Sequence, residues 1–172
     1  MPTGRQANSN GTGTIRILGI DPALRRTGYG LVDTDGHEFE PLDCGVIRTS
    51  PKEPLSECLR RLSGGIQELV TSWSPDMVAI EGGFFSRNVK TAMLLGAARG
   101  VVIAAVAAQS LTIYEYAPRR IKQAICGYGN ASKEQIATLI GQYLSLDVTE
   151  LPSDATDALG IAVCHAHTHF TN

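Results

Sequence analysis

The chain has 172 residues and a formal net charge of −2, and it is 43% hydrophobic and 19% charged. This length fits one globular domain with its own core, and the composition excludes a chain that is disordered throughout. The longest uncharged stretch, Gly100 to Tyr114, is shorter than the roughly 18 to 20 apolar residues that span a membrane, so we expect a cytoplasmic protein without membrane contact.

Residues 1–14 are rich in Gly, Ser, Asn and Thr and hold no apolar core, so we predict a disordered tail rather than a secretory signal. The single domain is then expected to span residues 15–172. The absence of C-x-x-C spacing favours packing in the core over disulfides or zinc binding for all four cysteines, Cys44, Cys58, Cys126 and Cys164.

Three strand-like segments come first in the domain. Ile15 to Ile20 is an apolar run that ends at Asp21, and Gly28 to Val32 and Gly45 to Thr49 are also typical of strands. Because turn residues separate them, we predict an antiparallel meander. Leu55 to Trp73 then has apolar residues at helical spacing, which predicts an amphipathic helix.

The second half of the chain is predicted to alternate strands with helices. The expected elements are a buried strand, a long helix, a strand and three more helices, at residues 77–80, 88–109, 111–116, from Pro118, 132–144 and 154–167. The order βββαβαβααα favours an α/β fold with a mixed five-stranded sheet and helices on both faces. Gly96 and Gly100 lie on an apolar helix whose surface is expected to face the core, a symmetric partner subunit, or both.

Charge is unevenly distributed along the chain. Seven basic residues and one acid lie between Gly82 and Lys133, whereas residues 134–172 contain five acids and no Lys or Arg. This polarity suits a protein that binds a polyanion with one surface and gathers carboxylates around a cation. Ordinary solvated faces would give the same pattern.

Four acids occupy positions that indicate a metal site. Asp21 and Glu81 each follow an apolar strand, while Asp154 and Asp157 are one helical turn apart on one face. Converging carboxylates repel one another unless a cation neutralises them, and hard oxygen ligands suit Mg²⁺ or Mn²⁺. We therefore expect two-ion phosphodiester hydrolysis. Taken singly, Asp154 would also suit the dipole at a helix N-terminus.

Three motifs resemble the RuvC family of Holliday-junction resolvases: GIDPALRRTGYG at 19–30, AIEGGFFSRN at 79–88 and DATDALGIAVCHAH at 154–167. The segments 95–105 and 114–133 are similar to that family too. The resemblance implies a homodimeric, ribonuclease H-like nuclease that nicks two opposed strands of a four-way DNA junction, with two Mg²⁺ ions per active site. A RuvA–RuvB branch-migration complex is an expected partner. The resemblance places the catalytic and metal-binding acids at Asp21, Glu81, Asp154 and Asp157.

DNA contacts are also implied by the resemblance. Phe84 matches an aromatic residue that stacks on bases near the junction centre, although packing of its loop against the core would equally explain it. Lys122 and Lys133 match basic residues near the cleaved phosphate, and as isolated lysines they would be ordinary solvated surface. The predicted DNA-binding set is completed by Arg87, Lys90 and Arg119.

The chain departs from the family pattern at two places. Ala23 stands where Gly usually follows Asp-Pro, and Gly82-Gly83 replaces bulkier residues, which bears on loop conformation and on cleavage preference. His165 shares the helical stripe of the acids but lies about 12 Å along the helix from Asp157, so we expect a structural role for it.

Two other functions fit parts of the sequence. The G-I-D motif followed by T-G suits a phosphate-binding hairpin of actin-like or sugar-kinase-like ATP-handling proteins, but no second Gly-rich phosphate loop is present. The other alternative is a catalytically weak junction-binding module, although all four proposed ligands are present.

Overall fold

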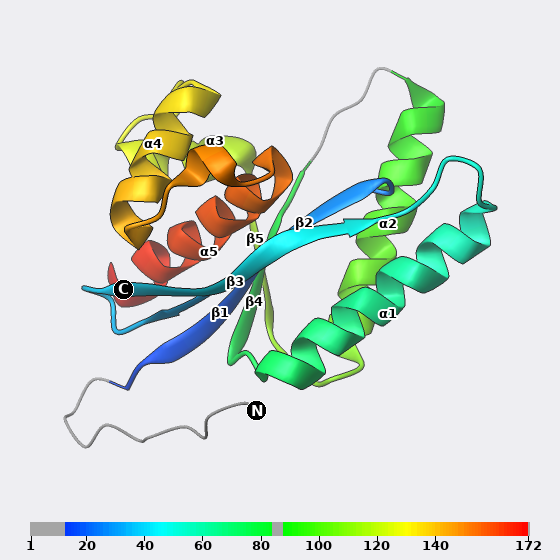
Figure 1. The fold of residues 1–172 in the computed structure, drawn as a ribbon, viewed down its shortest axis with the longest axis horizontal. Helices are drawn as coiled ribbons and strands as arrows, with labels where there is room; N and C mark the ends of the chain where they lie inside the picture. The colour runs from blue at the N-terminus through cyan, green and yellow to red at the C-terminus, as the bar shows by residue number, and fades with distance from the viewer. Residues whose placement is uncertain (1–12, 84–87, 172) are drawn as a thin grey trace.

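The computed structural model describes residues 13–83 and 88–171 (Figure 1). Its strands are β1 (Ile15–Asp21), β2 (Arg26–Thr34), β3 (Phe39–Arg48), β4 (Met77–Glu81) and β5 (Ile113–Tyr116). Its helices are α1 (Leu55–Trp73), α2 (Val89–Ala107), α3 (Pro118–Cys126), α4 (Lys133–Leu144), the 3-10 helix η1 (Val148–Glu150) and α5 (Ser153–Thr171). The predicted order of strands and α-helices is confirmed, and η1 is an addition.

The strands form one mixed sheet in the order β3-β2-β1-β4-β5. β1, β2 and β3 pair antiparallel, as the predicted meander requires, whereas β1 pairs with β4 and β4 with β5 in parallel. Because β1 and β4 are parallel and Ile20 pairs with Ile80, Asp21 and Glu81 follow at the same edge of the sheet. The topology therefore brings together two acids that are far apart in the sequence.

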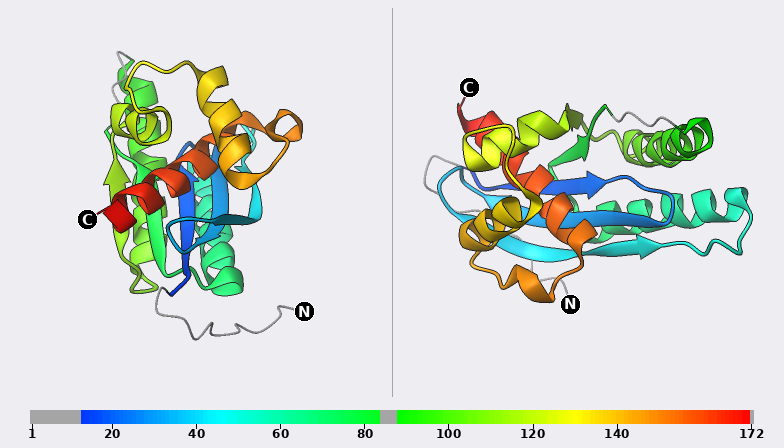
Figure 2. Two further views of the ribbon diagram at one scale, coloured as in Figure 1. Left: turned by 90° about the vertical axis from the view of Figure 1, so that its left-hand side faces the viewer. Right: turned by 90° about the horizontal axis from the view of Figure 1, so that it is seen from above.

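Helices cover both faces of the sheet (Figure 2). Strand side chains alternate between the faces, so Leu18 and Ile20 pack in a core with α1 and α2, whereas Ile17 packs in a second core with α3, α4 and α5. Both cores are mainly apolar, and Ile17, Leu18 and Ile20 have no exposed surface. The predicted layering is confirmed.

Glycines on β1 and β2 let α5 approach the sheet closely. A Cβ at Gly28 would lie 1.9 Å from the carbonyl oxygen of Asp154, and one at Gly19 would lie 2.1 Å from that of Ala158. A Cβ at Gly30 would likewise collide with Leu159. Since side chains at these positions would push α5 away, the glycines fix the height of its N-terminal half above the strands.

Some boundaries differ from the sequence predictions. β3 begins at Phe39 rather than Gly45, and it includes Pro41, which the edge position of β3 and a bulge at Leu31/Val32 accommodate. α5 continues to Thr171. Of the expected tail, residues 1–12 lie outside the described residues, while Gly13 and Thr14 precede β1 without regular structure. The four cysteines are free, and Cys58 and Cys164 are buried.

Helix α2 presents an apolar surface to solvent. By length and composition alone it could cross a membrane, and only 22% of that window is buried inside the domain. One side packs in the core through Ala98 and Val102, but Val89 and Met93 are 74% and 69% exposed. Added Cβ atoms at Gly96 and Gly100 would meet no other atom of residues 13–83 and 88–171 within 4 Å. This exposed side is called the open face of α2 below.

Candidate active site

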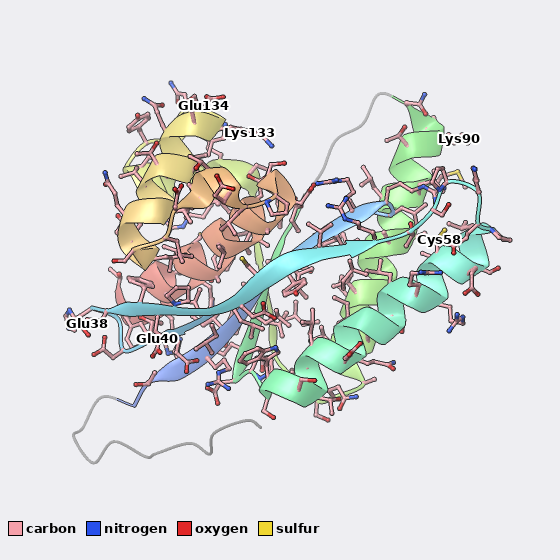
Figure 3. The ribbon with its side chains drawn as sticks, in the orientation of Figure 1. Glu38, Glu40, Cys58, Lys90, Lys133 and Glu134 are labelled. Atoms are coloured by element: carbon pink, nitrogen blue, oxygen red, sulfur yellow. The ribbon has the colours of Figure 1, made fainter. Side chains whose placement is uncertain are left out.

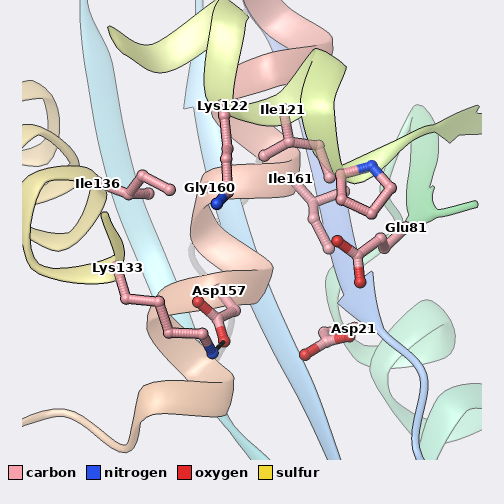
Figure 4. Close-up of a pocket in the computed structure, with 10 residues that line it drawn as sticks. Asp21, Glu81, Ile121, Lys122, Lys133, Ile136, Asp157, Gly160 and Ile161 are labelled. Carbon is pink, nitrogen blue, oxygen red and sulfur yellow. Dashed lines mark hydrogen bonds and ion pairs between the residues drawn. The ribbon is translucent and has the colours of Figure 1, made fainter. Parts of the chain in front are cut away.

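Three of the four predicted acids line one pocket. Its volume is about 270 Å³, and the carboxylates of Asp21, Glu81 and Asp157 lie around the same space (Figure 4). β1 and β4 supply the first two acids from adjacent strand ends, and α5 supplies the third from above the sheet. The other lining residues are mostly apolar or basic: Pro118, Ile121, Lys122, Lys133, Ile136, Gly160 and Ile161.

The pocket disfavours further negative charge. Burial, followed by the charges of Glu81, Asp157 and Asp154, raises the pKa of Asp21 to about 7. Burial and the Asp157 charge also raise the pKa of Glu81, against the opposing effect of Lys133 and Lys122. Carboxylates held this way are stabilised by a bound cation, because it offsets both desolvation and mutual repulsion.

Two of the acids are paired with basic side chains. Lys133 Nζ lies 3.1 Å from Asp157 Oδ2 (Figure 4), and Arg26 Nη2 lies 2.6 Å from Asp154 Oδ2. Asp154 pairs with Arg26 and, unlike the other three acids, does not line the pocket. Within residues 13–83 and 88–171, no three His, Cys, Asp or Glu side chains are placed to hold a metal ion together. A metal would require the paired carboxylates to turn.

The donor set nevertheless fits a hard divalent cation. The candidate ligands are carboxylate oxygens, which Mg²⁺ and Mn²⁺ prefer, and the negative charges that raise the pKa of Asp21 are those of three further acids. Lys133, which pairs with Asp157, and Lys122 line the same pocket, where they could neutralise a phosphate.

The predicted DNA-binding residues fall into three groups. Lys122 and Lys133 line the pocket, and Arg119 is exposed on α3, the helix that also carries Lys122. Lys90 is exposed on α2, well separated from Lys133 across the molecule (Figure 3). Phe84 and Arg87 lie outside the described residues. Lys122 and Lys133 therefore lie at the pocket, whereas Lys90 lies on a different helix away from Lys133.

Sequence reasoning did not single out Arg99, although it holds the end of β4. Its Nη1 donates a hydrogen bond to the Glu81 carbonyl oxygen at 3.1 Å, and its Nη2 pairs with Glu115 on β5. Arg99 also lines a second hollow beside the pocket, together with Asp21 and Gly83. The available signal was a basic residue within an otherwise apolar helix.

The two departures from the family pattern are accommodated locally. Ala23 does not need a positive φ; its backbone N–H donates to Thr27 Oγ1 at 3.2 Å, and Thr27 donates back to its carbonyl oxygen. Gly83 has φ +70°, a conformation that glycine adopts without strain, so the second glycine after Glu81 is required by the turn.

The expected structural role of His165 is confirmed. The residue is 1% exposed, and its Nδ1 lies 2.6 Å from the Tyr116 hydroxyl. Its Nε2 lies 3.1 Å from the Met77 sulfur, away from the acids. It belongs to the core beneath α5 rather than to the pocket.

The chain is similar to known proteins along most of its length. The family model of crossover junction endodeoxyribonuclease RuvC matches residues 17–165. The crossover junction endodeoxyribonuclease RuvC of Natranaerobius thermophilus is 43% identical, covering 89% of this chain and 95% of its own, and that of Alkaliphilus metalliredigens is 44% identical, covering 90% and 94%. The T. thermophilus RuvC solved in complex with Holliday junction substrate superimposes with a TM-score of 0.87 at 34% identity, covering 91% of this chain and 96% of that one. The ribonuclease H-like fold prediction is confirmed by this match, and the chain belongs to the RuvC family.

Proposed function

We propose that this protein is a structure-selective endonuclease that resolves Holliday junctions by nicking two opposed strands in DNA recombination and repair. One observation supports this function above all: carboxylates from β1, β4 and α5 meet in a single pocket that Lys122 and Lys133 also line. Phosphodiester hydrolysis needs carboxylates that can hold a divalent cation next to basic side chains that can hold a phosphate. Membership of the RuvC family supports the same substrate.

The proposed metal ligands are Asp21, Glu81, Asp154 and Asp157, holding two Mg²⁺ ions for which Mn²⁺ can substitute. The bound ions would supply Lewis-acid chemistry at the scissile phosphodiester. The elevated pKa of Asp21 supports this assignment, since a cation would restore the ionised carboxylate.

The chain's own residues bind and orient the DNA strand. Lys122 faces the pocket from α3, and Lys133 reaches in from the first turn of α4, where it now pairs with Asp157. An incoming phosphate gives Lys133 a second anionic partner. The positive charge of Lys133 then offsets the negative charge that builds up during cleavage. Ile121 and Ile136 border this space with apolar side chains.

The open face of α2 supports a homodimer. Val89, Met93, Gly96 and Gly100 form an apolar surface that the described residues leave uncovered, and small residues allow another helix to approach closely. A membrane-spanning role fits poorly, because Arg99 in the middle of α2 is paired with Glu115 within the domain. Two subunits related by two-fold symmetry would present one active site to each opposed strand.

We further place the protein in the cytoplasm and propose cooperation with a RuvA–RuvB branch-migration complex. Membership of the RuvC family supports both.

The main test is cleavage of a labelled four-way junction. With Mg²⁺, the unsubstituted protein is expected to make paired nicks, whereas Asp21→Asn is expected to reduce cleavage by about 10³-fold or more with junction binding retained. Glu68→Gln, which changes an exposed acid on α1, serves as the matched control and is expected to cleave normally. Junction binding without nicking by the unsubstituted protein would indicate a binding module instead, and ATP turnover would indicate an ATP-handling protein.

The dimer is tested separately by light scattering of the purified protein. Met93→Glu places a charge on the open face of α2 and is expected to shift the mass toward that of the 18.3 kDa monomer. Gln67→Glu on the exposed side of α1 is the control. A monomeric unsubstituted protein at concentrations that support cleavage contradicts the dimer.

A further inference from the structure

Asp154 differs from the other three acids because an arginine of the same chain, Arg26, pairs with its carboxylate. Arg26 Nε lies 2.8 Å and Nη2 2.6 Å from the same oxygen, Asp154 Oδ2. The two residues are 128 positions apart in the chain, so the contact depends on the fold alone. Arg26 begins β2 and Asp154 is in the first turn of α5.

The backbone fixes this pairing. The Asp154 carbonyl oxygen packs directly over Gly28, two residues after Arg26 on β2, where even a Cβ would collide. Neither backbone can move away without lifting α5 from the sheet. The side chains are freer, since that of Arg26 is 45% exposed and that of Asp154 is 23% exposed. The carboxylate can therefore turn while the backbone of its helix stays in place.

Asp154 is nevertheless close enough to act on the pocket. Its charge is among those that disfavour ionisation of Asp21, which lines the pocket. Arg26 contacts one of its two carboxylate oxygens, Oδ2, and Asp154 does not itself line the pocket. The carboxylate thus has two competing partners within reach: the guanidinium beside it and a cation among the other acids.

We propose that Arg26 competes with the divalent cation for the Asp154 carboxylate, so that metal binding requires exchange of this ion pair. This inference rests on the proposed function. Arg26 is a positioning residue that acts through Asp154 and lowers the affinity of the site for metal. Its pairing keeps Asp154 neutralised while no metal is bound, and its release completes the ligand set.

A neighbouring arginine serves as a control that distinguishes loss of the Arg26–Asp154 contact from simple loss of one positive charge. Arg48 lies directly opposite Arg26 in the register of β2 and β3 and is exposed. Asp154 pairs with Arg26 in the structure, and Arg48 carries the same charge one strand further from α5. Removing either charge lessens repulsion of a cation, but only removal of Arg26 frees Asp154.

The test is a Mn²⁺ titration of the metal-free protein without DNA, followed by electron paramagnetic resonance of free Mn²⁺. Arg26→Gln is expected to lower the dissociation constant about two- to fivefold, the range set by a partly exposed ion pair. Arg48→Gln is expected to lower it less, and Arg26→Lys, which keeps the charge, is expected to stay near the unsubstituted value. Raising the salt concentration should shrink the advantage of Arg26→Gln.

Two results would overturn the inference: an unchanged dissociation constant in Arg26→Gln, or an equal gain in Arg48→Gln. Misfolding cannot imitate the expected result, because tighter binding requires an intact site; thermal melting of each variant checks this. Asp21→Asn separates the two hypotheses. Loss of Mn²⁺ binding in Asp21→Asn with no effect of Arg26→Gln rejects only the role of Arg26, whereas normal Mn²⁺ binding in Asp21→Asn contradicts the proposed metal site as well.

Discussion

The two ends of α5 carry polar residues on one helical stripe, yet they are used differently. At the N-terminal end, the side chains of Asp154 and Asp157 are 23% and 36% exposed and lie among basic groups. Near the C-terminal end, His165 is 1% exposed and packs against Tyr114 at a ring distance of 4.3 Å. The helix is the same, but it crosses the sheet from an open edge into a closed core.

This difference shows that helical periodicity determines which residues share one face of α5, whereas the elements packed against that face determine whether its polar side chains are charged or neutral. At the edge, charge is tolerated because water, Lys133 and Arg26 are available. In the core, a charged imidazolium would have to be desolvated, so burial lowers the pKa of His165 to about 4 and the ring remains neutral. Substitutions at the two ends should therefore affect different properties.

The largest expected effect is on catalysis at the acidic end. Asp157→Asn should reduce junction cleavage by about 10³-fold or more, because it removes a proposed metal ligand while preserving shape. Gel-based cleavage under single-turnover conditions measures this, and gel-shift affinity should be almost unchanged. Cleavage within tenfold of the unsubstituted protein would remove Asp157 from the site.

At the other end, His165→Ala should affect stability instead. Losing a buried ring and its bond to the Tyr116 hydroxyl should lower the free energy of unfolding by about 2 to 4 kcal/mol. Urea denaturation measures the loss, and cleavage per folded molecule should be normal at low temperature. A selective loss of cleavage in a stable variant would instead connect His165 to the active site.

The two ends should also respond oppositely to pH in the metal-free protein. Between pH 3.8 and about 7 the folded protein keeps a proton on Asp21 that the unfolded chain releases, so this group lowers stability as the pH rises. Asp21→Asn should therefore raise the free energy of unfolding at pH 8, by roughly 2 kcal/mol, with little gain near pH 4. Saturating Mg²⁺ should abolish the advantage.

For His165 the sign is reversed. From pH 6.5 down to about 4 the unfolded chain takes up a proton that the folded protein does not, so stability contributed by the neutral ring is lost on acidification. His165→Ala should lack this part of the acid sensitivity. Paired denaturation curves at several pH values compare the two slopes, and parallel curves for the variant and the unsubstituted protein would contradict the difference.

The smallest expected effect concerns DNA affinity. Lys122→Ala should weaken junction binding a few-fold and reduce the salt dependence by about one counterion, because it removes one proposed phosphate contact beside the pocket. Affinity measured across several salt concentrations gives this slope. Lys52→Ala, an exposed lysine in the loop after β3 with no place in the pocket, provides the comparison.

Local pattern was enough to predict much of the molecule. Apolar runs predicted the strands that end at Asp21 and Glu81, and helical spacing predicted the helix at 55–73 and its buried face. The i,i+3 spacing placed Asp154 and Asp157 on one face of the last helix. β3 was predicted too short because Pro41 interrupts the strand pattern, and the bulge at Leu42 of β3, where the register with β2 shifts, is invisible in the sequence.

By itself, then, the sequence determined which segments are strands and helices and which acids stand at their ends, since backbone periodicity and side-chain polarity act over a few residues. Only the tertiary structure decided which partners these side chains meet: Arg26 for Asp154, the Glu81 carbonyl for Arg99 and the Tyr116 hydroxyl for His165. Such contacts depend on sheet register and on how closely glycines let α5 approach, and these are properties of packing between distant parts of the chain.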